Sequence, residues 1–246
     1  MLTRQTGVSS MELMVLPALG RTYRSVKEYE KANEILQEAL IISRATNNSR
    51  QEANTLVSLG NIAIDEGHPN VAIIFYKNAV DIYESLRGNI TSLDRGLQDS
   101  FTFSVESNYR KLAGLLLDGG RILEAQQVLE LLKAKELREF TRATYNTEGL
   151  QYDSIELPVV EAHGSLIQLG FDIMECDPNC DQVLYDRRVS LNGAYKKTIE
   201  TFEETIRDNR AIDDQFYDPN DFASDAADIV NAQAGTVLIY PIVLED

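Results

Sequence analysis

Apolar residues recur along most of the chain with the three- to four-residue spacing of amphipathic helices. The pattern predicts helices over residues 10 to 25, 28 to 46, 50 to 66, 69 to 86, 98 to 118 and 121 to 141. Two of them are expected to begin at capping boxes, Ser9-x-x-Glu12 and Ser49-x-x-Glu52. Turns are predicted at Gly67-His68-Pro69 and at Asp118-Gly119-Gly120. We therefore expect helices joined by short connections.

A 40-residue repeat underlies this series of helices. The residues that recur are Leu19-Gly20, Ala32 and Ala39, which return as Leu59-Gly60, Ala72 and Ala79. A Leu-Gly pair in one helix, followed by two alanines seven residues apart in the next, resembles the tetratricopeptide repeat (TPR). We expect each glycine to let the next helix approach closely and the first alanine to fill the crossing point. A third, degenerate copy is expected, with Ala113 in the glycine position followed by Ala125.

The predicted fold class is all-α. Because a single helix pair exposes a large apolar face, pairs of this kind stack into a solenoid. We expect a TPR-type solenoid of helical hairpins, with about three repeats, over residues 9–141, and a helical linker or arm over 142–234. The arm is predicted to contain a helical hairpin that breaks at Asp177-Pro178-Asn179, and then a short helix from Asp218 to about Gln233. The buried faces expected in the hairpin are Val160, Gly164, Ile167, Phe171 and Met174, and then Leu184, Leu191, Tyr195, Ile199, Phe202 and Ile206.

The last residues have a different pattern. Residues 236 to 244 are almost all apolar and predict a buried C-terminal strand. A single strand cannot satisfy its own backbone groups, so this one must lie on a helix, pair with another chain, or belong to a sheet encoded beyond Asp246. We favour the last alternative. Edge-to-edge pairing of this strand would also allow a dimer.

Two segments carry a resemblance to a known family. They are Tyr109 to Leu137 and Gly235 to Asp246. They resemble the last repeat and the opening protease strand of bacterial TPR–CHAT proteins, in which TPR repeats and a helical linker precede a caspase-like CHAT domain. The resemblance implies that residues 235–246 open a CHAT domain in cis. It also implies that the catalytic His and Cys lie beyond Asp246, so that this chain is not itself an enzyme.

The function that follows is a protein–protein interaction and regulatory module of a caspase-like protease. The alternative is a free-standing TPR adaptor that binds peptide segments in its concave groove. An enzyme in its own right is disfavoured, because the sequence has no phosphate-binding glycine loop and no paired-histidine motif.

The charge narrows the choice of partners. The formal net charge is -16, and most of the excess acid lies after residue 141. An acidic surface repels phosphate backbones and anionic lipid. No stretch reaches the roughly 20 apolar residues of a membrane helix. We therefore expect a protein or peptide partner, no nucleic acid and no membrane, and a cytoplasmic location.

The residues that commonly bind metals are few. Cys176 and Cys180 lack the further Cys or His ligands of a zinc site, so we expect a structural or redox-inactive pair. His68 and His163 are interpreted as surface or packing residues. Neither a metal nor a cofactor is predicted.

The predicted partner-binding site is the concave groove, which the first helix of each repeat lines. Its candidate residues are Arg21, Arg24, Asn54, Asn61, Asp65, Ser107, Arg110 and Lys111. Arginine and asparagine hold a peptide backbone or a carboxylate through directional hydrogen bonds, whereas a merely solvated face more often carries Lys and Glu. Contact with water alone accounts for some of these positions equally well.

Overall fold

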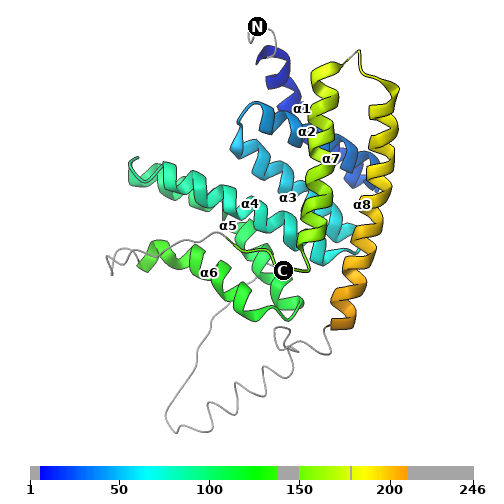
Figure 1. Cartoon of the computed structure of the whole chain (residues 1–246). Coiled ribbons are helices and arrows are strands. Elements are labelled where there is room, and N and C mark those ends of the chain that lie inside the picture. Colours follow the sequence, from blue (N-terminus) through cyan, green and yellow to red (C-terminus); the bar gives the residue numbers. More distant parts are fainter. Residues whose placement is uncertain (1–5, 138–149, 178, 210–246) are drawn as a thin grey trace. The chain divides into compact units, whose positions relative to one another are not determined.

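The computed structural model describes residues 6–137, 150–177 and 179–209 (Figure 1), and in these residues all regular structure is helical. The helices are α1 (Thr6–Ser25), α2 (Tyr29–Ala45), α3 (Ser49–Asp65), α4 (Pro69–Asn89), α5 (Arg95–Asp118), α6 (Ile122–Leu137), α7 (Leu157–Cys176) and α8 (Gln182–Asn209). The predicted helical solenoid is confirmed at this level. The predicted strand at 236 to 244 and the predicted short helix from Asp218 lie outside the described residues.

The turns between the first four helices share one geometry. Lys27, Asn47 and Gly67 have positive φ angles of 63, 52 and 84°. The backbone N–H of the next residue donates to a carbonyl five residues back, as in His68 to Ala63 at 2.8 Å. This is the Schellman arrangement that ends helices on a left-handed residue. The three left-handed residues are evenly spaced along the sequence, so each repeat consists of two helix-plus-turn units of equal length.

The turn between α5 and α6 has the same geometry. Gly120 has a φ of 74°, and the N–H of Arg121 donates to the carbonyl of Leu116 at 2.8 Å. The predicted third copy therefore has the same turn as the first two.

Both predicted capping boxes are wrong. Ser9 lies inside α1, which begins at Thr6. The N-cap of α3 is Asn48, whose side chain accepts a hydrogen bond from the N–H of Gln51 at 3.1 Å. Glu52 does not return to the cap, because its carboxylate binds Arg44 at 2.7 Å. An asparagine cap serves the same free N–H groups as a serine cap, so the helix start moves by one residue only.

The small residues of the repeat are buried, and its two glycines lie where the helices approach closely. The four repeat alanines are fully buried: Ala32, Ala39, Ala72 and Ala79. A Cβ atom on Gly20 would lie 2.7 Å from the side chain of Leu36, and one on Gly60 would lie 2.9 Å from that of Tyr76. Because Leu36 and Tyr76 occupy equivalent positions of the two copies, both repeats pack in the same way. The close approach predicted from the glycines is confirmed.

The described helices fall into two compact units. The first contains α1 to α4, α5 as far as Gln98, the segment from residue 150, α7, and α8 through Thr205. The second contains the rest of α5, α6 and the end of α8 from Ile206. The predicted domain boundaries after residues 141 and 234 lie outside the described residues and stay predictions.

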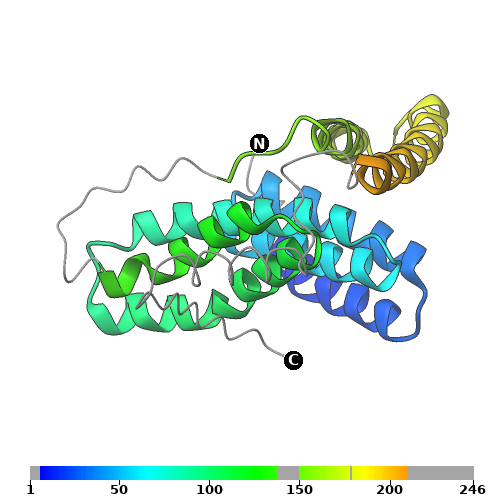
Figure 2. The ribbon, with the colours of Figure 1, turned by 90° about the horizontal axis from the view of Figure 1, so that it is seen from below.

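Within the first unit, α7 and α8 lie against α2 and α4 (Figure 2). Gly170 of α7 meets Ile41 of α2 so closely that a Cβ atom on the glycine would overlap Cδ1 of the isoleucine. Asn70 of α4 donates to Glu203 of α8 at 2.6 Å. The predicted helical hairpin therefore forms and packs along the second helices of the repeats.

The prediction of the buried face of the hairpin is right in part for both helices: the predicted Leu184, Leu191 and Ile199 of α8 are half-buried, and the predicted Ile167 of α7 is buried. Tyr195, Phe202 and Ile206 are buried as expected. In α7 the buried residues are Val159, Leu166, Ile167, Leu169, Gly170 and Ile173, whereas the predicted Gly164 is exposed. The face is displaced by about one residue because contact with α2, far away in sequence, selects Gly170 as the point of closest approach.

Candidate functional site

The first helices of the two N-terminal repeats, α1 and α3, carry five of the predicted groove residues. Two of them bind each other: Nε and Nη2 of Arg24 donate to the two carboxylate oxygens of Asp65 at 2.6 and 3.1 Å. The hydrogen bond to Asp65 raises the pKa of Arg24 above its usual value. A two-point contact of this kind fixes the orientation of both planar groups. It ties the C-terminal turn of α1 to that of α3.

Two asparagines of α3 are held by tyrosines of α4. The hydroxyl of Tyr83 donates to Oδ1 of Asn54 at 3.2 Å, and that of Tyr76 donates to Oδ1 of Asn61 at 3.0 Å. Both tyrosines are buried. Burial raises the pKa of Tyr76 to about 12, so its hydroxyl keeps its proton at neutral pH. With the carbonyl end of each amide engaged, the amide nitrogen is the end that can donate to a ligand.

Arg21 differs from Arg24, although it lies one turn away on the same helix. Its side chain is exposed and makes no ion pair with any of the described residues. The face of α1 and α3 thus combines one such cation, one fixed ion pair and two oriented amides. These groups can bind a polypeptide, and none is a nucleophile with an adjacent base.

The remaining candidates, Ser107, Arg110 and Lys111, lie on α5 in the second unit. Nε of Arg110 donates to Glu106 one turn away at 2.9 Å. Ser107 and Lys111 are exposed. Because they belong to the second unit, these three residues are described separately from the face of α1 and α3. Whether a partner contacts any of the eight candidates stays a prediction.

The comparison with protein families identifies repeats in the N-terminal part of the chain. The tetratricopeptide repeat family matches residues 11–85. The chain contains TPR repeats. The match includes α2, α3 and most of α1 and α4, which are the two copies of the 40-residue period. No curated protein and no solved structure matches the chain. TPR repeats generally mediate protein–protein interaction.

Away from the face of α1 and α3, the residues before α7 are fixed to α4. We call residues 150–156 the strap. Nζ of Lys77 donates to Glu156 at 2.9 Å and to the carbonyl of Gln151 at 3.0 Å. The side chains of Lys77 and Glu156 are 1% and 0% exposed, so this ion pair is buried. The N–H of Leu150 donates to Asp81 at 2.8 Å. The strap therefore covers one side of α4.

The strap was not predicted from the sequence, although one signal was present. Lys77 interrupts a long apolar run, Val71 to Val80, at a position that faces the core. A lysine there needs a buried acceptor, because an unpaired charge is costly in the interior. The partner, Glu156, lies far along the chain, so its identity could not be read from the local pattern.

His163 is a packing residue of α7. Its ring lies 5.0 Å from that of Phe75 on α4 and 5.6 Å from that of Tyr195 on α8, measured between centroids. Burial lowers the pKa of His163 to about 4, and the positive charge of Arg44 acts in the same direction. The imidazole is therefore neutral at pH 7.

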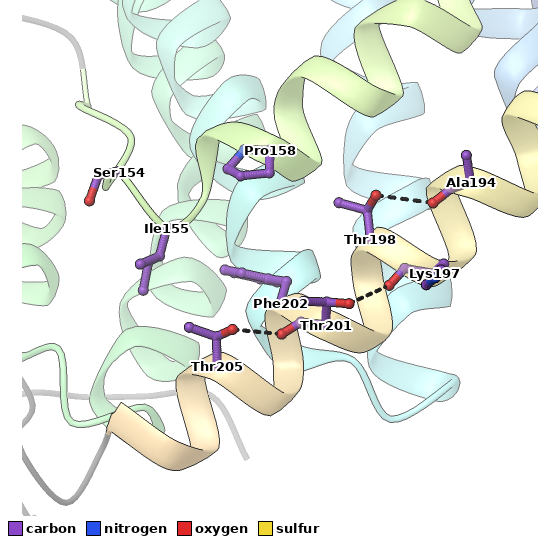
Figure 3. A pocket seen from close by; sticks show the side chains of 9 residues that line it. All are labelled: Ser154, Ile155, Pro158, Ala194, Lys197, Thr198, Thr201, Phe202 and Thr205. Atoms are coloured by element: carbon purple, nitrogen blue, oxygen red, sulfur yellow. Dashed lines mark hydrogen bonds between the residues drawn. The ribbon is translucent and has the colours of Figure 1, made fainter.

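A groove runs along the hairpin (Figure 3). One wall is formed by α8, and Ser154, Ile155 and Pro158 close one end. The α8 residues that line it are Ala194, Lys197, Thr198, Thr201, Phe202 and Thr205. Its volume is about 670 Å³. This groove was not predicted from the sequence, because the residues that line it come from segments that are distant along the chain.

The two cysteines form a disulfide across the turn between α7 and α8. The expectation that this pair is structural or redox-inactive stays a prediction. Across the described residues, no group of three or more His, Cys, Asp or Glu side chains is placed as metal ligands would be. None of the described helices has an apolar stretch long enough to cross a membrane.

Proposed function

We propose that the chain binds an extended segment of another protein on the face formed by α1 and α3, and that it acts through this interaction and not by catalysis. The observation that carries the proposal is the pair of hydrogen bonds from Tyr83 and Tyr76 to Asn54 and Asn61. They orient two amides whose nitrogen ends can donate to backbone carbonyls.

The spacing of the two asparagines suits an extended peptide. They are two helical turns apart on α3, a distance of about 10 Å along a helix. About three residues of extended chain span the same distance. Arg21 adds a cation that attracts a carboxylate of the segment. The proposed ligand is therefore an extended peptide with an acidic residue near one end.

Variants of the full chain test this proposal. The partner is first isolated by affinity capture and identified, and the segment it contributes is then titrated by calorimetry. Asn61→Asp keeps the acceptor for Tyr76 and removes the amide donor, so we expect binding at least about fivefold weaker. Arg21→Glu should weaken binding of an acidic segment by a similar factor.

Arg187→Glu is the matched control, because Arg187 is exposed on α8 and also reverses one charge. It should leave the affinity unchanged. Equal affinity of the Arg21→Glu, Asn61→Asp and wild-type chains, all folded by circular dichroism, would remove the proposal.

A finer proposal concerns what the interaction controls. We propose that it regulates a caspase-like CHAT domain in the same protein, since residues 109 to 137 and 235 to 246 resemble the last repeat and opening strand of TPR–CHAT proteins. The gene downstream of Asp246 should then encode a sheet-forming domain with a His and a Cys. A stop codon after Asp246 would favour the free-standing adaptor. Light scattering with and without residues 235 to 246 tests the dimer: an unchanged mass would exclude it.

A further inference from the structure

The groove on the hairpin is independent of the face of α1 and α3. It follows α8 from Ala194 to Thr205, a length of about 17 Å in a helix. This is the length of about three helical turns. A small molecule would occupy only part of such a groove, whereas a second helix would follow all of it.

The groove offers a ligand mainly apolar surface, although several threonines line it. The hydroxyls of Thr198, Thr201 and Thr205 donate to the carbonyls four residues earlier, at 3.0, 3.0 and 2.8 Å (Figure 3). These hydroxyls already have partners and need none from a ligand. Ile155 and Pro158 add further apolar surface at one end. The groove therefore favours aliphatic side chains.

The small residues along α8 are spaced as in a helix-packing face. Ala194, Thr198, Thr201 and Thr205 follow one another at intervals of four, three and four residues. Side chains of this size allow helix axes to approach to about 8 Å. Aliphatic residues of a partner helix with the same spacing would lie between them.

The groove carries one charged side chain, Lys197. Lys197 is the only charged residue among those that line it. It is exposed and makes no ion pair among the described residues, whereas the adjacent Lys196 binds Glu30 at 2.5 Å. A partner helix that brings a carboxylate beside its aliphatic stripe would complete an ion pair with Lys197, and one that brings a lysine would be repelled.

We propose that this groove binds an amphipathic helix of a partner protein, with an aliphatic stripe at four- and three-residue intervals and a carboxylate that contacts Lys197. It is a second interaction surface, separate from the face of α1 and α3.

Two synthetic peptides probe it. Both are stapled helices of about 18 residues, long enough to be helical, with leucines at the stated spacing. One has glutamates beside the central leucines and the other has lysines. Fluorescence anisotropy with the full chain should show the glutamate peptide binding about two- to fivefold more tightly, the range of one exposed ion pair. Lys197→Glu should reverse that order.

Thr201→Arg fills the groove and should weaken both peptides at least about tenfold. Ala194→Arg blocks the groove at another exposed position and tests the same point if Thr201→Arg does not fold. Arg21→Glu should leave both affinities unchanged, which separates this result from the test of the proposed function. Three results would overturn the inference: absence of binding, binding insensitive to Thr201→Arg and Ala194→Arg, and an unchanged order with Lys197→Glu. Self-association of the unliganded chain that Thr201→Arg abolishes would assign the groove to a second copy and overturn it too.

Discussion

The contact between Gly170 of α7 and Ile41 of α2 predicts a large effect of a single methyl group. In Gly170→Ala, the new Cβ would overlap Cδ1 of Ile41 and lie 3.1 Å from its Cγ1. Carbon atoms in contact prefer about 3.5–4.0 Å. Ile41 is buried and β-branched, so its side chain has little room to turn away. Forcing an extra methyl into such a site costs about 1–3 kcal/mol.

Gly164 provides the matched control, because it lies in the same helix with nothing within 4 Å of an added Cβ. Alanine is a better helix former than glycine by about 1 kcal/mol, and this gain is common to both variants. The difference between Gly170→Ala and Gly164→Ala therefore isolates the steric cost. We expect Gly164→Ala to be stabilised by about 0.5–1 kcal/mol, and Gly170→Ala to lie about 1–3 kcal/mol below it.

Urea unfolding followed by circular dichroism measures both free energies of unfolding, with hydrogen exchange reporting on the amides of α7. The double variant Gly170→Ala, Ile41→Val lacks Cδ1 and should recover much of the loss. Equal stability of the Gly170→Ala and Gly164→Ala chains would refute the packing of α7 on α2.

Three further substitutions test other parts of the first unit. Lys77→Met removes the ion-pair partner of the buried Glu156 carboxylate, so urea unfolding should show a loss of about 3–5 kcal/mol. Most of this loss should be regained in Lys77→Met, Glu156→Leu, and an equal loss in both variants would argue against a buried pair. His163 has a lowered pKa, so the unfolded chain takes up its proton near pH 6.5 and the folded chain only near pH 4. Its contribution to stability is full above pH 6.5 and falls with pH toward 4, by at most about 1.4 kcal/mol per pH unit. His163→Phe should remove that component from the pH profile, and an unchanged profile would contradict it. Gly67→Ala should lower the free energy of unfolding by about 1 kcal/mol, because φ is positive there, whereas Gly88→Ala inside α4 should raise it; effects of the same sign would be inconsistent with the turn geometry.

The sequence predicts the repeat well because its signals are local. Gly20 and Gly60, with the alanines that follow, occur at a fixed spacing and are buried as that spacing requires. The turn geometry was harder to predict. Two of the left-handed residues are Lys27 and Asn47, and neither marks a turn as clearly as Gly67 does.

What the sequence could not predict depends on contacts between distant segments. Arg24 and Asp65 were each expected to face a partner, but nothing local indicates that these residues of two different helices bind each other. The tyrosines that orient Asn54 and Asn61 read as ordinary core residues of α4, because their rings are buried and only the hydroxyls reach the asparagines. The face of α7 was displaced by one residue for the same reason, since Ile41 of α2 determines it.

The even spacing of the left-handed turns bears on how such a chain can change in length. Every turn from α1 to α4 has the same geometry. A block of two helices can therefore be duplicated or deleted between equivalent turns, because the new turn has the geometry of those already present. Insertions of other lengths would displace Leu36 and Tyr76 from the glycines that they face. The turns therefore allow this molecule to grow in steps of one whole repeat.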